Sequence, residues 1–107
     1  MIKVTLQLDG GGCLRRLQSE GHAVGQKGSN IVCAAATALM RSAARVLADH
    51  DSIVVSGHVP LEGVLEIEVD RYAPQDRAYL LGVTEVLVRG LQDLALEEPT
   101  EVSINLA

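Results

Sequence analysis

Residues 21–44 read GHAVGQKGSNIVCAAATALMRSAA, and they join a glycine-rich segment to a long apolar one. Apolar side chains at positions 32, 35, 36, 39, 43 and 47 recur at helical spacing, which predicts a helix from Ile31 to about Asp49 with one buried face. Its many alanines allow the helix to lie close to a sheet. The preceding segment, Gly21 to Ser29, is predicted to be a loop that is mobile in the free protein, because its three glycines make ordering costly.

The side chains that can carry chemistry lie where this loop meets the helix. Asn30 is a preferred N-cap residue, which would make Cys33 the third residue of the helix. A thiol at that position lies at the positive end of the helix dipole, which favours the reactive thiolate. Free N–H groups of the first turn, including that of Cys33, would then be available to hold an oxyanion.

Two interpretations of Cys33 remain open from spacing alone. His22 lies eleven residues upstream, and a glycine-rich loop can fold its imidazole back onto the thiol as a nucleophile–base pair. A free cysteine in an apolar helix is more often a core residue, and spacing alone favours that alternative. Cys33 nevertheless falls at the edge of the apolar stripe, on the helix face that also carries Thr37, Met40, Arg41 and Ala44.

The order Gly21-His22, then Asn30-Ile31-Val32-Cys33-Ala34-Ala35, then Thr37 resembles the motif of the ribosomal-processing cysteine protease family, Prp. The family pattern is G-H, a loop, then D-I-V-C-A-A-x-S, and the similarity in length and segment order extends over nearly the whole chain. The resemblance implies that Cys33 and His22 are the catalytic pair, with Gly21 beside them. Asn30 stands where the family has Asp, and Thr37 where it has Ser.

A third polar group often orients the histidine of such a pair. Asn30 and Thr37 are the candidates for this supporting role, since one helical turn places Thr37 beside Cys33. Two simpler roles compete with it: Asn30 as a helix cap, and a hydrogen bond from the Thr37 hydroxyl back to a helix carbonyl. His58 is a rival base, and His50 can complement the negative end of the helix dipole.

The resemblance also implies what the protein would act on. A Prp-like endopeptidase would remove the basic N-terminal extension from the precursor of a large-subunit ribosomal protein, would need no cofactor and would form a homodimer. A second hypothesis is a non-catalytic, ribosome-associated binding module of the same fold. Its support is the missing family Asp at Asn30.

Composition narrows the remaining classes of function. The 107 residues carry a net charge of −5 without any block of Lys or Arg, so direct nucleic-acid binding is not expected. Two cysteines are too few for a disulfide scaffold, and no metal-ligand spacing is present, so Cys13 is expected to be structural. We expect a cytoplasmic protein with reduced thiols, because there is no signal-peptide pattern and no apolar run near the ~20 residues of a membrane span.

The rest of the chain predicts one α+β domain spanning residues 1–107. Alternating patterns predict strands at residues 1–9, 13–20, 53–59, 65–70 and 102–106, and a second helix from Pro74 or Asp76 to about Ala95. Leu14 and Leu17 fall on opposite faces of a regular strand, which predicts a bulge. The order β-β-α-β-β-α-β favours a mainly antiparallel sheet with two helices on one face.

Overall fold

The computed structural model describes residues 1–21 and 27–107, and the elements follow the predicted order. In chain order they are β1 (Ile2–Leu8), β2 (Leu14–Glu20), α1 (Lys27–Ala48), β3 (Ile53–His58), β4 (Val64–Tyr72), a 3-10 turn (Pro74–Asp76), α2 (Arg77–Glu97) and β5 (Val102–Leu106).

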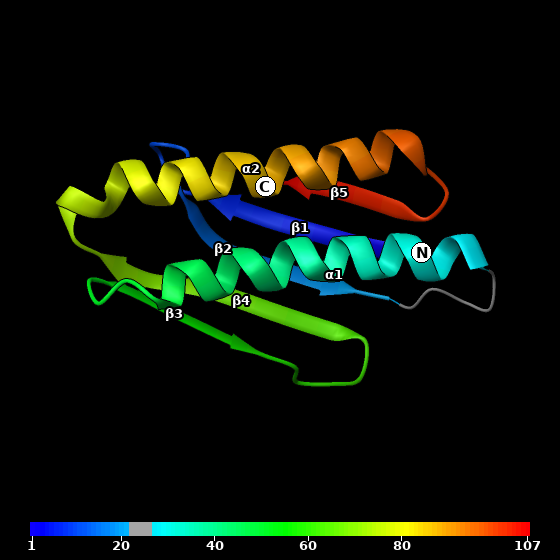
Figure 1. Cartoon of the computed structure of the whole chain (residues 1–107), viewed down its shortest axis with the longest axis horizontal. Coiled ribbons are helices and arrows are strands. Elements are labelled where there is room, and N and C mark those ends of the chain that lie inside the picture. Colours follow the sequence, from blue (N-terminus) through cyan, green and yellow to red (C-terminus); the bar gives the residue numbers. More distant parts are fainter. Residues whose placement is uncertain (22–26) are drawn as a thin grey trace.

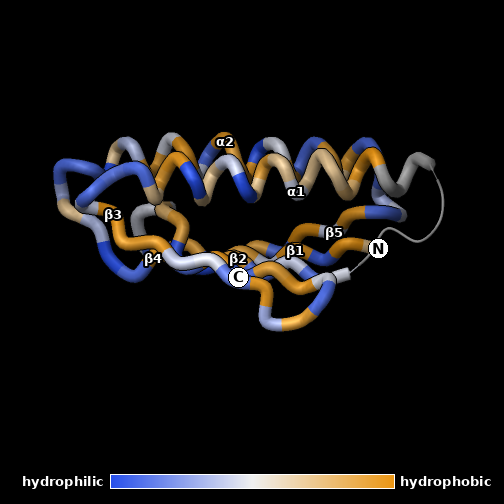
Figure 2. Tube along the Cα trace, turned by 60° about the horizontal axis from the view of Figure 1, so that its bottom comes forward, coloured by the Kyte–Doolittle hydropathy of each residue, from blue (hydrophilic) through white to orange (hydrophobic). Residues whose placement is uncertain are grey.

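The strands form one mixed sheet with the order β3-β4-β2-β1-β5. Three of the pairings are antiparallel, and β5 pairs with β1 in parallel. Both helices lie on the same side of the sheet, and no helix or strand of the described residues covers its other face, which we call the uncovered face (Figures 1 and 2). This arrangement confirms the predicted α+β fold with a mainly antiparallel sheet.

The core lies between the sheet and the helix pair. Ile2, Val4 and Leu6 alternate with exposed or half-buried residues along β1, as a strand covered on one face requires. In α1, Met40 is buried, while the predicted core residue Leu39 is only half-buried. Leu39 instead packs against α2, where a Cβ on Gly90 would approach its Cδ1 to 2.8 Å. The buried face of α1 is therefore turned from the predicted one by its contact with α2.

The predicted bulge in β2 is confirmed. Leu8 pairs with Leu14 but Gln7 pairs with Arg16, so Arg15 is the extra residue. The bulge lets Leu14 and Leu17 both point into the core. Beside it, the Leu14 N–H donates to the Thr84 hydroxyl at 3.0 Å, and that hydroxyl donates to the Leu80 carbonyl at 2.8 Å. This buried pair of hydrogen bonds fixes α2 on β2.

Helix α1 begins earlier than the sequence predicts. It starts at Lys27, so Asn30 lies inside its first turn, and the N-cap prediction for Asn30 is wrong. Lys27 to Ser29 likewise belong to the helix and not to the loop. Each residue added to an existing helix gains a hydrogen bond, which outweighs the low propensity of Gly28 and Ser29. Residues 22–26 of the predicted mobile loop lie outside the described residues.

The window Ile31–Ala48 of α1 is apolar enough to cross a membrane by length and composition, with a mean hydropathy of 1.5 over 18 residues. The expectation that no apolar run approaches a membrane span is therefore wrong. In the fold, the same helix packs against α2 and β3. Packing within this domain thus accounts for the apolar residues of α1.

The turn between β1 and β2 is organised by Asp9. Its carboxylate accepts hydrogen bonds from the N–H groups of Gly11 and Cys13 at 2.9 Å each, and from the Tyr72 hydroxyl at 2.9 Å. Arg77 donates to the Gly11 carbonyl at 3.1 Å. The bond from the Cys13 N–H, with help from the other donors, lowers the pKa of Asp9, and the Asp9 carboxylate raises the pKa of Tyr72. Asp9 thereby joins the turn to the end of β4.

The lowered pKa of Asp9 predicts a specific loss of stability in acid. An Asp whose pKa is lower in the folded than in the unfolded state stabilises the fold above its unfolded value of ~3.9 and loses this effect as pH falls through the folded value. Asp9→Asn is expected to reduce the free energy of unfolding by about 1 kcal/mol at pH 7, with solvent screening limiting the loss. Urea unfolding should show that this difference shrinks below about pH 4. A difference that is constant with pH would contradict the assignment.

Candidate active site

A cleft of about 410 Å³ runs along α1, opposite β3 and β4 and beside the ends of β1 and β2. Cys33 lines it together with Thr37, Met40, Arg41 and Ala44 from the same helix. This is the helix face that the sequence predicts, and its grouping is confirmed. The thiol of Cys33 is half-buried, so it is held by packing and remains open to the cleft.

The opposite wall of the cleft is mostly apolar. It is formed by Ile2, Ser19, Gly21, Gly57, Val59, Gly63, Val64, Leu65 and Ile67. Among them Ser19 is a buried polar residue, and Val59 is largely exposed at the end of β3. The lining residues of α1 extend from Cys33 to Arg45, and a cleft that follows the helix over this stretch, with an apolar opposite wall, suits a peptide in extended form.

The earlier start of α1 changes the electrostatics expected at Cys33. Only the first four N–H groups of an α-helix lack an intrahelical partner, and in a helix that starts at Lys27 all four precede Asn30. Cys33 lies in the second turn, so the predictions that it is the third helical residue and that its N–H is free for an oxyanion are wrong. The dipole effect on its thiolate is also weaker there, because it falls off within the first turn.

Thr37 lies one turn beyond Cys33 and is half-buried in the same cleft. Among the described residues, no hydrogen bond joins its hydroxyl to a helix carbonyl, whereas Thr84 does donate to Leu80 in that way. The described residues therefore give no support to the alternative role of Thr37, a hydrogen bond from its hydroxyl to a carbonyl of α1. Its hydroxyl is available to the cleft.

Gly21 is the described residue closest in sequence to the predicted base. His22 itself, and the side chain of Asn30, lie outside the described residues. Gly21 lines the cleft, has a φ of +116°, and donates its N–H to the Gly63 carbonyl at 3.0 Å. A Cβ at this position would collide with the Met1 carbonyl oxygen. Only glycine fits both the conformation and the space.

Gly21→Ala is expected to destabilise the protein by about 1–3 kcal/mol, because alanine is strained at this φ and its Cβ meets backbone atoms of Met1 and Ile2. Thermal unfolding of the purified variant measures the loss. Gly10→Ala is the matched control, since a Cβ there meets nothing within 4 Å. Equal melting temperatures for Gly21→Ala and wild type would show that the collision is relieved by a small backbone shift.

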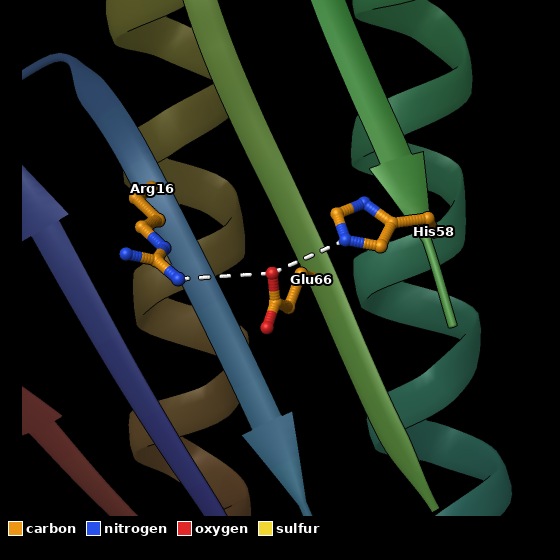
Figure 3. A network of polar contacts seen from close by, with 3 residues as sticks. All are labelled: Arg16, His58 and Glu66. Atoms are coloured by element: carbon orange, nitrogen blue, oxygen red, sulfur yellow. Dashed lines mark ion pairs between the residues drawn. The ribbon is translucent and has the colours of Figure 1, made fainter. Parts of the chain in front are cut away.

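The other histidines lie away from the thiol. His58 contacts Glu66 at 3.3 Å, and Arg16 approaches the same Glu66 oxygen at 3.7 Å. Figure 3 shows these three side chains in front of the strands with the helices behind, so they occupy the uncovered face of the sheet. His58 thus points away from α1, which removes it as the rival base.

His50 and Cys13 have other surroundings. His50 follows the far end of α1, stacks on Tyr79 with ring centroids 3.9 Å apart, and has its Nδ1 3.9 Å from Asp76. Cys13 is fully buried, with its sulfur 3.8 Å from the Arg77 carbonyl oxygen. Across residues 1–21 and 31–107, no three His, Cys, Asp or Glu side chains converge in a way that could hold a metal ion.

Sequence reasoning missed Arg45 and Ser19, which also line the cleft, and assigned no role to Arg41. The signal for the arginines was available: Arg41 and Arg45 are the only charged residues between Ile31 and Ala48. Their spacing of four places them on one helix face. The signal for Ser19 was its spacing of two from Leu17, which places both side chains on the same face of β2.

Comparison with known proteins agrees with this fold. The sequence model of the family described as cysteine protease Prp matches residues 1–103. The fold is similar to SMU.848 from Streptococcus mutans, with 25% identity, a TM-score of 0.84, and coverage of 99% of this chain and 93% of that one. It is also similar to the ribosomal processing protease Prp from S. aureus, solved with a covalently linked product peptide and with a substrate peptide. Each of these two structures has 20% sequence identity to this chain and a TM-score of 0.81, and the match covers all of both chains. No curated protein matches the sequence.

Proposed function

Because this chain belongs to the Prp family of cysteine proteases, we propose that Cys33 is its nucleophile and His22 its general base. The observation that carries this assignment is that Cys33 and Gly21 line one cleft. His22 is bonded directly to Gly21, and consecutive Cα atoms lie ~3.8 Å apart. This adjacency along the chain supports the proposal that the His22 imidazole acts on the thiol in this cleft.

The proposed reaction proceeds in two steps. His22 takes the proton of the Cys33 thiol, and the thiolate forms a C–S bond to the peptide carbonyl carbon. The tetrahedral intermediate collapses to a thioester as the C–N bond breaks, and His22 returns the proton to the leaving amine. Water, deprotonated by His22, then attacks the thioester, releases the carboxylate product and restores the thiol.

The supporting residues have defined places in this scheme. The Thr37 hydroxyl can donate to the imidazole or to the developing oxyanion, since it shares the cleft with Cys33. Asn30 lies in the first turn of α1, at the positive end of the helix dipole. Asn30 therefore contributes to the positive end of the helix through its backbone, a role that the family's Asp would share.

The proposed substrate is the precursor of a large-subunit ribosomal protein, cut at its N-terminal extension. The support is the family match, and the similarity to an S. aureus protein that is a ribosomal processing protease. The mostly apolar wall of the cleft is suited to apolar side chains around the cut bond. Since ribosomal subunits assemble in the cytoplasm, we propose that the enzyme works there, which fractionation of the producing cells can test.

Incubation with the purified precursor from the same organism, followed by mass spectrometry of the products, tests this function. We expect a single cut that removes the extension. The alternative, a non-catalytic binding module, predicts an intact precursor and a thiol that reacts slowly with iodoacetamide at neutral pH. Rapid alkylation of Cys33 together with an uncut precursor would be consistent with a cysteine protease but would exclude this precursor as its substrate.

A homodimer is also proposed. The outer surface of the helix pair has an apolar groove of about 460 Å³, to which Val46, Tyr79 and Val86 contribute exposed side chains. Exposed apolar patches of this kind commonly mark protein interfaces. A sedimentation coefficient of a monomer at micromolar concentration would contradict the proposal.

A further inference from the structure

The charge inside the cleft is opposite to that of the chain. The protein has a net charge of −5, yet no Asp or Glu is among the described residues that line the cleft. The charged residues among them are Arg41 and Arg45, both on α1. An apolar cleft with two cations and no anion favours a ligand that brings its own negative charge.

Neither guanidinium has a partner among the residues that the structure describes. Within the described part of the chain, Arg16 pairs with Glu66 and Arg77 donates to Gly11, but no ion pair or hydrogen bond involves Arg41 or Arg45. A position near the C-terminal end of α1 gives Arg45 a favourable dipole interaction. The same explanation fails for Arg41, which lies about two turns before the end of the helix.

We propose that Arg41 and Arg45 select peptide substrates with an Asp or Glu side chain about four to six residues from the bond that is cut. The inference rests on the proposed role of Cys33. Arg41 and Arg45 follow Cys33 by eight and twelve residues on one helix, hence by about 12 and 18 Å at ~1.5 Å per residue. An extended peptide advances ~3.3 Å per residue, so those distances correspond to about four and six residues.

The chemistry favours a carboxylate on a peptide. Arginine binds carboxylates through two parallel N–H···O bonds, and the pair spaced by one turn can hold one carboxylate from two sides. Lysine or arginine in this part of the substrate would meet two like charges. The basic residues expected in a ribosomal extension must therefore lie outside this end of the cleft.

Binding to an inactive enzyme tests the proposal without depending on cleavage. Fluorescein-labelled peptides of alternating leucine and serine, with one Asp, Asn or Lys placed at each position in turn, are titrated with Cys33→Ala protein and followed by anisotropy. Peptides with Asp at the matching distance are expected to bind about 5–30-fold more tightly than those with Lys. The preference should weaken at high salt, because the arginines are exposed.

Charge reversal supplies the decisive comparison. The double variant Arg41→Glu/Arg45→Glu, in the Cys33→Ala background, is expected to prefer the Lys peptide, and Arg89→Glu on α2 is the matched control that should leave the preference unchanged. Equal affinity of the Asp, Asn and Lys peptides for the unreversed protein at every position would overturn the proposal. A preference for the Asp peptide that persists in Arg41→Glu/Arg45→Glu would also overturn it. If the active enzyme cuts no precursor while the Asp preference and its reversal hold, the proposed function fails and the charge selection stands.

Discussion

Replacing Cys33 with alanine is expected to abolish peptide cleavage and leave the fold intact. The thiol supplies the atom that forms the thioester, and no other described cysteine lines the cleft. The side chain is half-buried, so loss of the sulfur leaves only a small void. Mass spectrometry of the precursor after incubation measures the activity, and thermal unfolding checks that the fold is preserved.

Cys13→Ala is the control for this experiment. Cys13 is fully buried in the core, so the variant is expected to lose about 1 kcal/mol of stability and to cut at the normal rate per folded molecule. Equal loss of cleavage in the two variants would indicate a structural effect, and would contradict the assignment of Cys33 as the nucleophile.

His22→Ala is expected to reduce kcat/KM by about 10²–10⁴-fold, the usual range for loss of a general acid–base. The same variant should slow the alkylation of Cys33 by iodoacetamide, because the imidazole helps to form the thiolate. The alkylation rate separates a base from a merely structural histidine, since only a base changes the reactivity of the thiol.

His58→Ala and His50→Ala are the controls, and both should cut normally. His58 lies on the uncovered face of the sheet, and His50 follows the end of α1 that is roughly 22 Å from Cys33 by helix rise. Full activity in all three variants would mean that the base comes from outside these histidines. It would then have to be a group that sequence reasoning did not consider.

Local patterns in the sequence predict most of the elements but not their pairing. Alternation along Ile2 to Leu8 predicts a strand, and the misplacement of Leu14 against Leu17 predicts the bulge that the structure contains. Nothing in a period of two specifies that β5 lies parallel to β1 at one edge. That choice depends on contacts between residues about one hundred positions apart, which no window of the sequence contains.

The site shows the same division. Helical periodicity correctly groups Cys33 with Thr37 and Arg41, because the angle between positions is fixed by helix geometry. The predicted start of α1 is wrong. Cap preferences are statistical, so an Asn such as Asn30 can occur inside the first turn of a helix without capping it. The bonds around Asp9 and Thr84 join segments distant in sequence, so they were not predictable from either segment alone.

The parallel pairing of β5 with β1 has a consequence for how the chain folds during translation. Strands β1 and β2 can form a hairpin as soon as they are made, but β1 keeps one open edge until residues 102–106 have left the ribosomal tunnel. Closing so long a loop is slow relative to hairpin formation. The nascent chain therefore passes through a stage in which β1 presents unpaired backbone groups, and aggregation at that stage should be the main hazard of overproduction.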